Sequence, residues 1–198
     1  HACVLLRRSA VEAVKGYDET LFMYGEDVEL SYRLRQAGYL LRYCSGATVW
    51  HYSYEFGNQI KPLQYTGSTF ANLYIRLKYG KLTDAAVVPL LAIRLLLSPQ
   101  VFVGSRRQVA LSLIRLLACA PKALMSRRST SAYFPFRTWD YDIIRDGAFV
   151  ELQPLPAEQP LVSIITRTYM GRDLYLRQAL LSAVHQTWRN IEIIVVED

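Results

Sequence analysis

Three carboxylates, Glu26, Asp27 and Glu29, fall within four positions of the stretch "MYGEDVEL". Acidic side chains at the start of a helix complement the helix dipole, and this alternative accounts for any of the three. A carboxylate that points toward a core instead needs a partner or a chemical task. A positioned carboxylate can take a proton as a general base. The stretch is therefore a candidate for proton transfer as well as for helix capping.

The helix that begins with these residues separates their roles. Apolar spacing predicts a helix over residues 26–37, and Gly38 stands where a helix-ending glycine belongs. At 100° per residue, Asp27 falls on the apolar face of this helix. Glu29 falls beside that face and can pair with Arg33, four positions later. We therefore interpret Glu29 as a surface ion-pair partner and Asp27 as an inward-facing carboxylate at the edge of a sheet.

Polar residues also follow predicted strands elsewhere in the chain. His51 comes after the extended run "ATVW", which can deliver it to the edge that Asp27 occupies, although a lone histidine is usually structural. Thr166 and Thr168 end the strand-like run "LVSIITRTY", and Asp198 ends the next strand. Ligands bind beyond these ends in open parallel sheets, with ordinary loop polarity as the alternative. The sequence has no GxGxxG and no Walker pattern, which argues against a Rossmann dinucleotide site and a P-loop.

The N-terminal elements that must position Asp27 alternate between strand and helix. The runs "ACVLLRR", "YLLRYC" and "ATVWHY" are strand-like. The short helix "SAVEAV" is expected to have Ser9 as its N-cap, with Glu12 at capping-box spacing. Residues 65–80 are expected to be helical. Residues 82–128 form two apolar stretches that are rich in Leu and Arg and punctuated by prolines.

The C-terminal part of the chain changes composition twice. Residues 133–160 carry three prolines in the seven positions from Pro154, as linkers do. A buried strand, a helix over residues 172–186 and a second buried strand follow, and two Val/Ile-rich strands joined by a helix predict a parallel sheet. The chain begins at His1 and ends at Asp198, each within an apolar run. We therefore interpret it as an internal part of a longer protein.

The composition of the chain indicates its cellular compartment and the kind of partner to expect. Hydrophobic residues make up 52% of the chain, which predicts a packed core. The three cysteines have neither metal-ligand nor redox spacing, so a reducing, cytoplasmic compartment is expected. Residues 85–132 hold seven basic residues and no acid, so they account for the whole net charge of +6 and leave about −1 for the rest. Basic charge concentrated on an apolar segment indicates an anionic surface as a partner.

This basic apolar segment has two alternatives. It can form amphipathic helices on an anionic membrane surface, or an interdomain helical bundle with solvated arginines. Arg94 and Arg115 interrupt its apolar stretches, which disfavours a membrane-spanning helix. A nucleic-acid role is not expected, because the basic residues stand among leucines without aromatic stacking partners.

The longest pattern in the sequence surrounds the three carboxylates. "GYDETLFMYGEDVELSYRLRQAGYLLRYCSGATVWHY" resembles the C-terminal part of the catalytic domain of family 2 glycosyltransferases, which have the GT-A fold, and the likeness covers roughly residues 1–54. "PLVSIITRTYMGRDLYLRQALLSAVHQTWRNIEIIVVED" resembles the beginning of the same kind of domain. An end followed by a beginning implies the middle of a tandem, two-domain enzyme of the sort that builds bacterial surface polysaccharides in the cell envelope.

The resemblance implies roles for individual residues. Asp27 would be the base that deprotonates the acceptor hydroxyl in an inverting transfer, and Glu26 would shape that site. His51 would ligate the divalent cation, Mg²⁺ or Mn²⁺, that holds the donor diphosphate. The donor nucleotide would be bound by Thr166, Thr168, Tyr169 and Asp198.

The same resemblance implies the partners and the location. A nucleotide-diphosphate sugar would be the donor, and a glycan or lipid-linked molecule the acceptor. The enzyme would be cytoplasmic and peripheral at the inner membrane. A non-catalytic interdomain or membrane-surface docking region of a polysaccharide-synthesis protein is the alternative.

The sequence also departs from the family pattern. Arg167 and Met170 stand where proline and asparagine are common, and Glu197 replaces the usual first aspartate. The DxD motif for metal and diphosphate is missing, because the "DYD" that starts at Asp140 falls in the predicted linker. We therefore expect the isolated chain to be inactive.

The expected fold is α/β, with partial GT-A units at both ends joined by a helical segment. The expected divisions are residues 1–64 for the end of a first transferase domain, 65–132 for the helical basic segment, 133–160 for a linker and 161–198 for the start of a second transferase domain.

Overall fold

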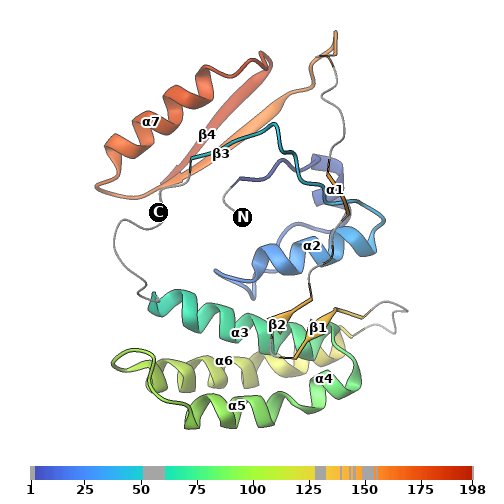
Figure 1. The fold of residues 1–198 in the computed structure, drawn as a ribbon, viewed down its shortest axis with the longest axis vertical. Coiled ribbons are helices and arrows are strands. Elements are labelled where there is room, and N and C mark those ends of the chain that lie inside the picture. The colour runs from blue at the N-terminus through green and yellow to red at the C-terminus, as the bar shows by residue number, and fades with distance from the viewer. Residues whose placement is uncertain are drawn as a thin grey trace. The chain divides into compact units, whose positions relative to one another are not determined.

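The structure is a computed structural model with two compact units, His1–Phe149 and Val150–Asp198 (Figure 1). They are called here the first unit and the second unit. The structure describes residues 3–50, 61–127, 133–138, 140–142, 144, 146–148, 154 and 156–197.

The first unit is mainly helical within the described residues. Its elements are α1 (Arg8–Ala13), α2 (Glu26–Gln36), α3 (Pro62–Tyr79), α4 (Leu82–Ala86), α5 (Val88–Leu97), α6 (Ser105–Met125) and two short strands, β1 (Phe136–Arg137) and β2 (Asp140–Tyr141). The two strands pair antiparallel.

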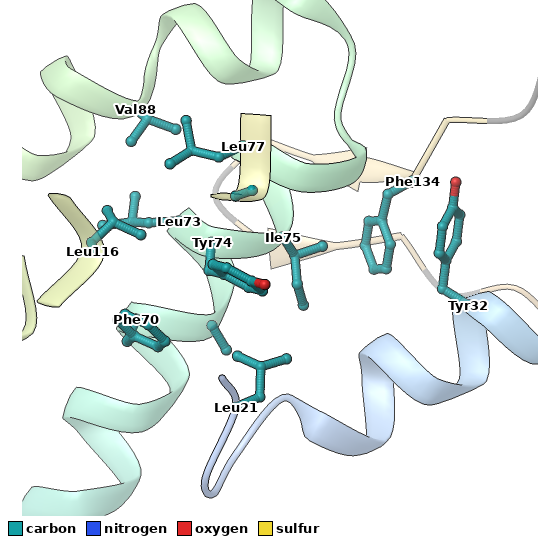
Figure 2. Packing of buried hydrophobic residues seen from close by; sticks show 12 residues of the cluster. Leu21, Tyr32, Phe70, Leu73, Tyr74, Ile75, Leu77, Val88, Leu116 and Phe134 are labelled. Atoms are coloured by element: carbon teal, nitrogen blue, oxygen red, sulfur yellow. The ribbon is translucent and has the colours of Figure 1, made fainter. Parts of the chain in front are cut away.

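Helix α3 lies at the centre of the first unit's core. Its residues 69–77 are all buried, as expected of a helix surrounded by other elements. Figure 2 shows the side chains that pack around it: Leu116 from α6, Val88 from α5, Tyr32 from α2 and Leu21 from the turn before α2. Because α2 and its preceding turn contact α3 directly, this core fixes the position of the carboxylates at the start of α2.

The predicted boundaries of α2 are confirmed to within a residue. The helix runs over Glu26–Gln36, and Gly38 follows it with a φ of 86°, the left-handed conformation that glycine adopts most easily. The backbone N–H of Tyr39 then donates to the carbonyl oxygen of Leu34 at 3.0 Å, which closes the helix end.

The predicted capping box of α1 is wrong. The helix begins at Arg8, its N-cap is Arg7, and no side chain caps it. Glu12 instead accepts a hydrogen bond from Arg8 Nε at 2.7 Å, on the exposed surface. Glu12 therefore forms an i, i+4 ion pair with Arg8 and does not cap the helix.

The extended runs predicted in the first unit do not form a sheet within the described residues. The segment before α1 is coil, and the runs after α2 contribute only an isolated bridge between Tyr43 and Ala148. A strand needs neighbouring strands to satisfy its backbone N–H and C=O groups. The periodic pattern alone could not supply those neighbours.

Part of the span expected to be a linker packs into the first unit. Phe134 is buried, and its N–H donates to the carbonyl oxygen of Tyr79 at 3.1 Å. Arg76 of α3 donates to the carbonyl oxygen of Thr138 at 2.6 Å, and its guanidinium lies 4.1 Å from the centre of the Phe136 ring. The aromatic residues of this span are therefore part of the core, and the proline-rich residues follow them.

The described part of residues 82–128 forms three helices, α4, α5 and α6. Pro89 lies in the first turn of α5, where its missing N–H costs nothing, and Pro121 lies inside α6. Among the described helices, α6 is long and apolar enough to cross a membrane by length and composition, with 17% of its apolar window buried.

The second unit contains β3 (Val162–Thr168), α7 (Asp173–Val184) and β4 (Ile191–Glu197). The strands pair in parallel, from Val162 beside Ile191 to Thr168 beside Glu197. The predicted strand–helix–strand unit is thus confirmed, and so is the mixed helix-and-sheet class of the chain.

Candidate functional site

A tight turn holds the start of α2 against α3. Gly25 precedes the helix with a φ of 104°, and a Cβ placed on it would lie 2.3 Å from the Cβ of Ala71. A Cβ on Gly67 of α3 would lie 2.5 Å from the carbonyl oxygen of Met23. Two glycines, one on each side of the contact, therefore let the turn approach α3 closely and set where the carboxylates begin.

Glu26 and Asp27 occupy the first turn of α2 and are partly buried. Asp27 Oδ1 accepts a hydrogen bond from the N–H of Val28 at 2.8 Å. Glu26 Oε2 is buried and has no hydrogen-bond partner among the described residues. Buried acceptors are nearly always satisfied, by protein, water or ligand, so this oxygen is a candidate to receive a hydroxyl group. The positive end of the helix dipole favours the negative charge of both carboxylates.

Two tyrosines are within electrostatic reach of Asp27. Burial raises the pKa of Tyr17, and the carboxylates of Glu26 and Asp27 raise it further. Burial also raises the pKa of Tyr141, followed by the charge of Asp140 and, more weakly, that of Asp27. Both phenols are therefore protonated at neutral pH. Sequence reasoning did not single out either: Tyr17 stands in the "GYDE" pattern, and Tyr141 falls in the span predicted to be linker.

Glu29 is not a surface residue, and that part of the prediction is wrong. Its pairing with Arg33 is present, with Arg33 Nη2 2.6 Å and Nε 2.8 Å from Oε2, but the Glu29 side chain is 0% exposed. Tyr79 donates to Oε1 at 2.5 Å, and Lys78 Nζ lies 3.3 Å from the same oxygen. Charged donors from α2 and α3 satisfy this carboxylate, which makes it a structural centre.

Asp18 extends the Glu29 network into the turn before α2. Lys78 Nζ lies 2.6 Å from Asp18 Oδ2, the hydroxyl of Tyr74 donates to the same oxygen at 2.9 Å, and the N–H of Thr20 donates to Oδ1 at 2.9 Å. Burial opposes ionisation of Asp18, but these donors and the charge of Lys78 lower its pKa to about 2. Lys78 thus bridges Asp18 and Glu29 and ties the turn and α2 to α3. No local sequence signal predicts this, because the partners are 49 to 60 positions apart.

The predicted metal ligand, His51, lies outside the described residues. Within the part of the chain that the structure describes, no group of three or more His, Cys, Asp or Glu side chains is gathered in a way that could hold a metal ion. The described residues therefore do not build a metal centre by themselves.

The predicted nucleotide-binding residues of the second unit lie at the carboxyl end of β3. Thr166 and Thr168 are half-buried on one face of the strand, and Thr168 pairs with Glu197 of β4. Tyr169 follows, and its hydroxyl oxygen accepts a hydrogen bond from Arg172 Nε at 2.7 Å. Thr166, Thr168 and Tyr169 thus gather at one sheet edge.

The fourth predicted nucleotide ligand, Asp198, lies outside the described residues. Arg172 is an unpredicted neighbour of this edge, because its guanidinium also lies over the Tyr169 ring, 4.9 Å from the ring centre.

Similarity to proteins of known name covers short stretches. The chain is 51% identical over 51 residues to an N-acetylglucosaminyl-diphospho-decaprenol L-rhamnosyltransferase of Mycobacterium tuberculosis, which is 26% of this chain and 17% of that relative. It is 59% identical over 39 residues to an uncharacterized glycosyltransferase of Rickettsia typhi, 20% of this chain and 12% of the relative. A glycosyltransferase of Rickettsia felis is 52% identical over 46 residues, 23% of this chain and 8% of the relative.

No family model matches the chain, and no solved structure matches it. The chain spans less than a fifth of the length of each of these three relatives. Its homologues are glycosyltransferases, at about half identity over short stretches, and they support a transferase.

Proposed function

We propose that this chain is part of a longer enzyme, and that this longer enzyme is a family 2, GT-A glycosyltransferase. In this proposal it moves a sugar from a nucleotide-diphosphate donor to a glycan or lipid-linked acceptor, with inversion. The first unit supplies the acceptor side, and Asp27 is the base. The observation that carries the proposal is the sequence identity of 51% and 59%, over 51 and 39 residues, with two proteins named as glycosyltransferases. The chain also has a carboxylate pair at the start of α2.

The proposed step is a single displacement. The Asp27 carboxylate takes the proton of the acceptor hydroxyl, and the acceptor oxygen forms a bond to the anomeric carbon of the donor sugar. The bond from that carbon to the diphosphate oxygen breaks, and its electron pair leaves with the nucleoside diphosphate. Glu26 orients the acceptor through its buried Oε2, which has no partner among the described residues.

The binding of the donor nucleotide is assigned to residues of the second unit. In this proposal Thr166, Thr168, Tyr169 and Asp198 contact the nucleotide of a donor bound to the longer enzyme. A divalent cation, Mg²⁺ or Mn²⁺, would neutralise the donor diphosphate, with His51 as one ligand. The free cysteines Cys3, Cys44 and Cys119 agree with a cytoplasmic, reducing location.

The name of one relative suggests the acceptor to try first. The Mycobacterium tuberculosis rhamnosyltransferase acts, by its name, on N-acetylglucosaminyl-diphospho-decaprenol. A polyprenyl-diphosphate-linked sugar is therefore the acceptor class that we propose for the enzyme containing this chain.

The test uses the purified longer enzyme with a panel of nucleotide-diphosphate sugars and a short polyprenyl-diphosphate-linked acceptor. We expect release of nucleoside diphosphate that depends on the acceptor, and a product whose anomeric configuration, read by NMR, is opposite to that of the donor. Retention of configuration would contradict the single displacement. Absence of sugar transfer from every donor would contradict the proposed activity.

A further inference from the structure

The outer end of the α5–α6 hairpin combines exposed apolar and basic side chains. We propose that this end, called here the docking surface, binds the surface of an anionic lipid bilayer. It consists of the apolar side chains Leu97, Val101 and Val103 and the basic side chains Arg94, Arg106 and Arg107. It joins the end of α5, the connecting loop and the start of α6 (Figure 1).

The apolar members of the docking surface are exposed far beyond what folding requires. Leu97 is 77% exposed, Val101 43% and Val103 99%. Phe102, between the two valines, turns inward and meets the ring of Tyr65 on α3 edge-on, with 6.0 Å between ring centres. Phe102 thus anchors the loop to α3, while Val101 and Val103 on either side of it stay exposed.

The basic members of the docking surface are three exposed arginines. Arg94, Arg106 and Arg107 are exposed and form no ion pair with any described residue. Arg115, in the same segment, is used internally: it donates to the carbonyl oxygen of Thr20 at 2.7 Å and lies over the ring of Phe70 at 4.6 Å. The positive charge of the segment is thus divided between internal contacts and the docking surface.

A partner for this surface must be anionic and must accept apolar side chains beside the charges. No acid occurs between residues 85 and 132, so nothing in the segment neutralises the three arginines. A bilayer with anionic headgroups meets both conditions, because arginines bind headgroup phosphates while short apolar side chains enter the acyl boundary. Nucleic acid would leave Leu97 and Val103 in water.

The packing of α6 ties the docking surface to the core of the first unit. Val109, Leu116 and Ala123 form a buried stripe along α6, and Leu116 and Ala123 belong to the core around α3. Through this stripe α6 is held against α3, so the start of α6 and the loop before it keep a fixed place on the first unit. The opposite side of α6 is exposed, with Ile114 63% exposed.

The test is flotation of the 198-residue chain with vesicles, compared between phosphatidylcholine alone and phosphatidylcholine with about 30% phosphatidylglycerol. We expect flotation with the anionic vesicles only, and loss of it in about 1 M salt, where the Debye length is ~3 Å. Each basic residue near an anionic surface raises the affinity roughly fivefold. Arg94→Gln, Arg106→Gln and Arg107→Gln together should therefore lower the partition coefficient roughly 100-fold.

The matched control is Arg7→Gln, Arg42→Gln and Arg137→Gln, three exposed arginines elsewhere in the first unit. It lowers the net charge by the same amount and should leave most of the binding intact. Val103→Ser, which keeps every charge, should weaken binding roughly tenfold, because it removes one inserted apolar side chain.

Any one of four results would overturn the proposal. The chain could fail to float with anionic vesicles, or float equally with neutral vesicles and in high salt. The control triple variant could weaken binding as much as the docking-surface variant. Finally, sedimentation could show self-association that Val103→Ser abolishes in a chain that binds no vesicles, which would assign the surface to a second copy.

Discussion

Glu29 and Asp27 stand two positions apart on α2 but have opposite environments. Glu29 is fully buried and bonded to Arg33, Lys78 and Tyr79, so its charge is already used by the fold. Asp27 is partly buried, and its Oδ1 accepts a hydrogen bond from the backbone N–H of Val28. The sequence could predict the Glu29–Arg33 spacing, but not the burial, because Lys78 and Tyr79 reach Glu29 only after α3 packs on α2.

Removing the charge of Glu29 should lower the free energy of unfolding of the first unit. In Glu29→Gln, Arg33 and Lys78 lose a shared buried anion, and leaving a buried charge without its partner costs about 3 kcal/mol. Urea denaturation measures the free energy of unfolding. The matched control is Glu12→Gln, which breaks an exposed pair of the same spacing and should cost at most about 0.5 kcal/mol. Equal effects of the two variants would contradict the buried network.

Asp18 should make the stability depend on pH in acid. Its pKa is lowered from the ordinary 3.8 to about 2 by Lys78, Thr20 and Tyr74. Because the folded pKa lies below the unfolded one, the stabilisation is complete above about pH 4 and is lost as the pH falls toward 2. Partial exposure reduces it to roughly 1–2 kcal/mol. Asp18→Asn should therefore be less stable than the unsubstituted chain at pH 7 and differ little from it at pH 2. A gap that stays constant over this range would contradict the lowered pKa.

The elements of this chain differ in how far the sequence determines them. Helix α2 is predictable because its apolar spacing and Gly38 are local signals. The β3–α7–β4 unit is predictable because Val/Ile-rich strands flank one helix. The extended runs around Tyr43 are not, because strand formation depends on neighbours that no local pattern specifies.

The turn before α2 should tolerate no side chain at Gly25. Gly25→Ala combines a left-handed φ with a Cβ 2.3 Å from that of Ala71. We therefore expect the free energy of unfolding to fall by about 3 kcal/mol or more. Gly16→Ala is the control, since Gly16 also has a positive φ, of 70°, but nothing lies within 4 Å of an added Cβ. The control should lose about 1–2 kcal/mol. Thermal unfolding of both variants separates the steric contact from backbone strain, and equal losses would show that the contact with Ala71 does not matter.

The whole molecule joins a helical first unit to a short parallel second unit. The second unit leaves apolar strand residues open, with Ile165 68% and Val195 43% exposed. Parallel sheets are normally covered on both faces, so we expect further elements to cover this sheet in the proposed longer enzyme. The basic segment was identified from its charge alone. The sequence did not indicate that Arg115, among its arginines, contacts Thr20 and Phe70 in the first unit.

The candidate site could be predicted only in part from the sequence. The sequence located Asp27 and Glu26 at the start of a helix, and the structure adds Tyr17 and Tyr141 as phenols whose pKa the charge of Asp27 raises. The proposed role of His51 stays a prediction. Tyr141 could not have been predicted as a neighbour, because 114 positions separate it from Asp27 and only the packing of β2 against α3 brings it there.

The most direct test of the account is the turnover number of Asp27→Asn in the longer enzyme, measured together with its unfolding midpoint. Asparagine keeps the oxygen that accepts the Val28 N–H but cannot take a proton. We predict a fall in kcat of at least about 100-fold, with the unfolding free energy changed by less than about 0.5 kcal/mol. Unchanged turnover would contradict the assignment of Asp27 as the base, and a large loss of stability would show that Asp27, like Glu29, is structural.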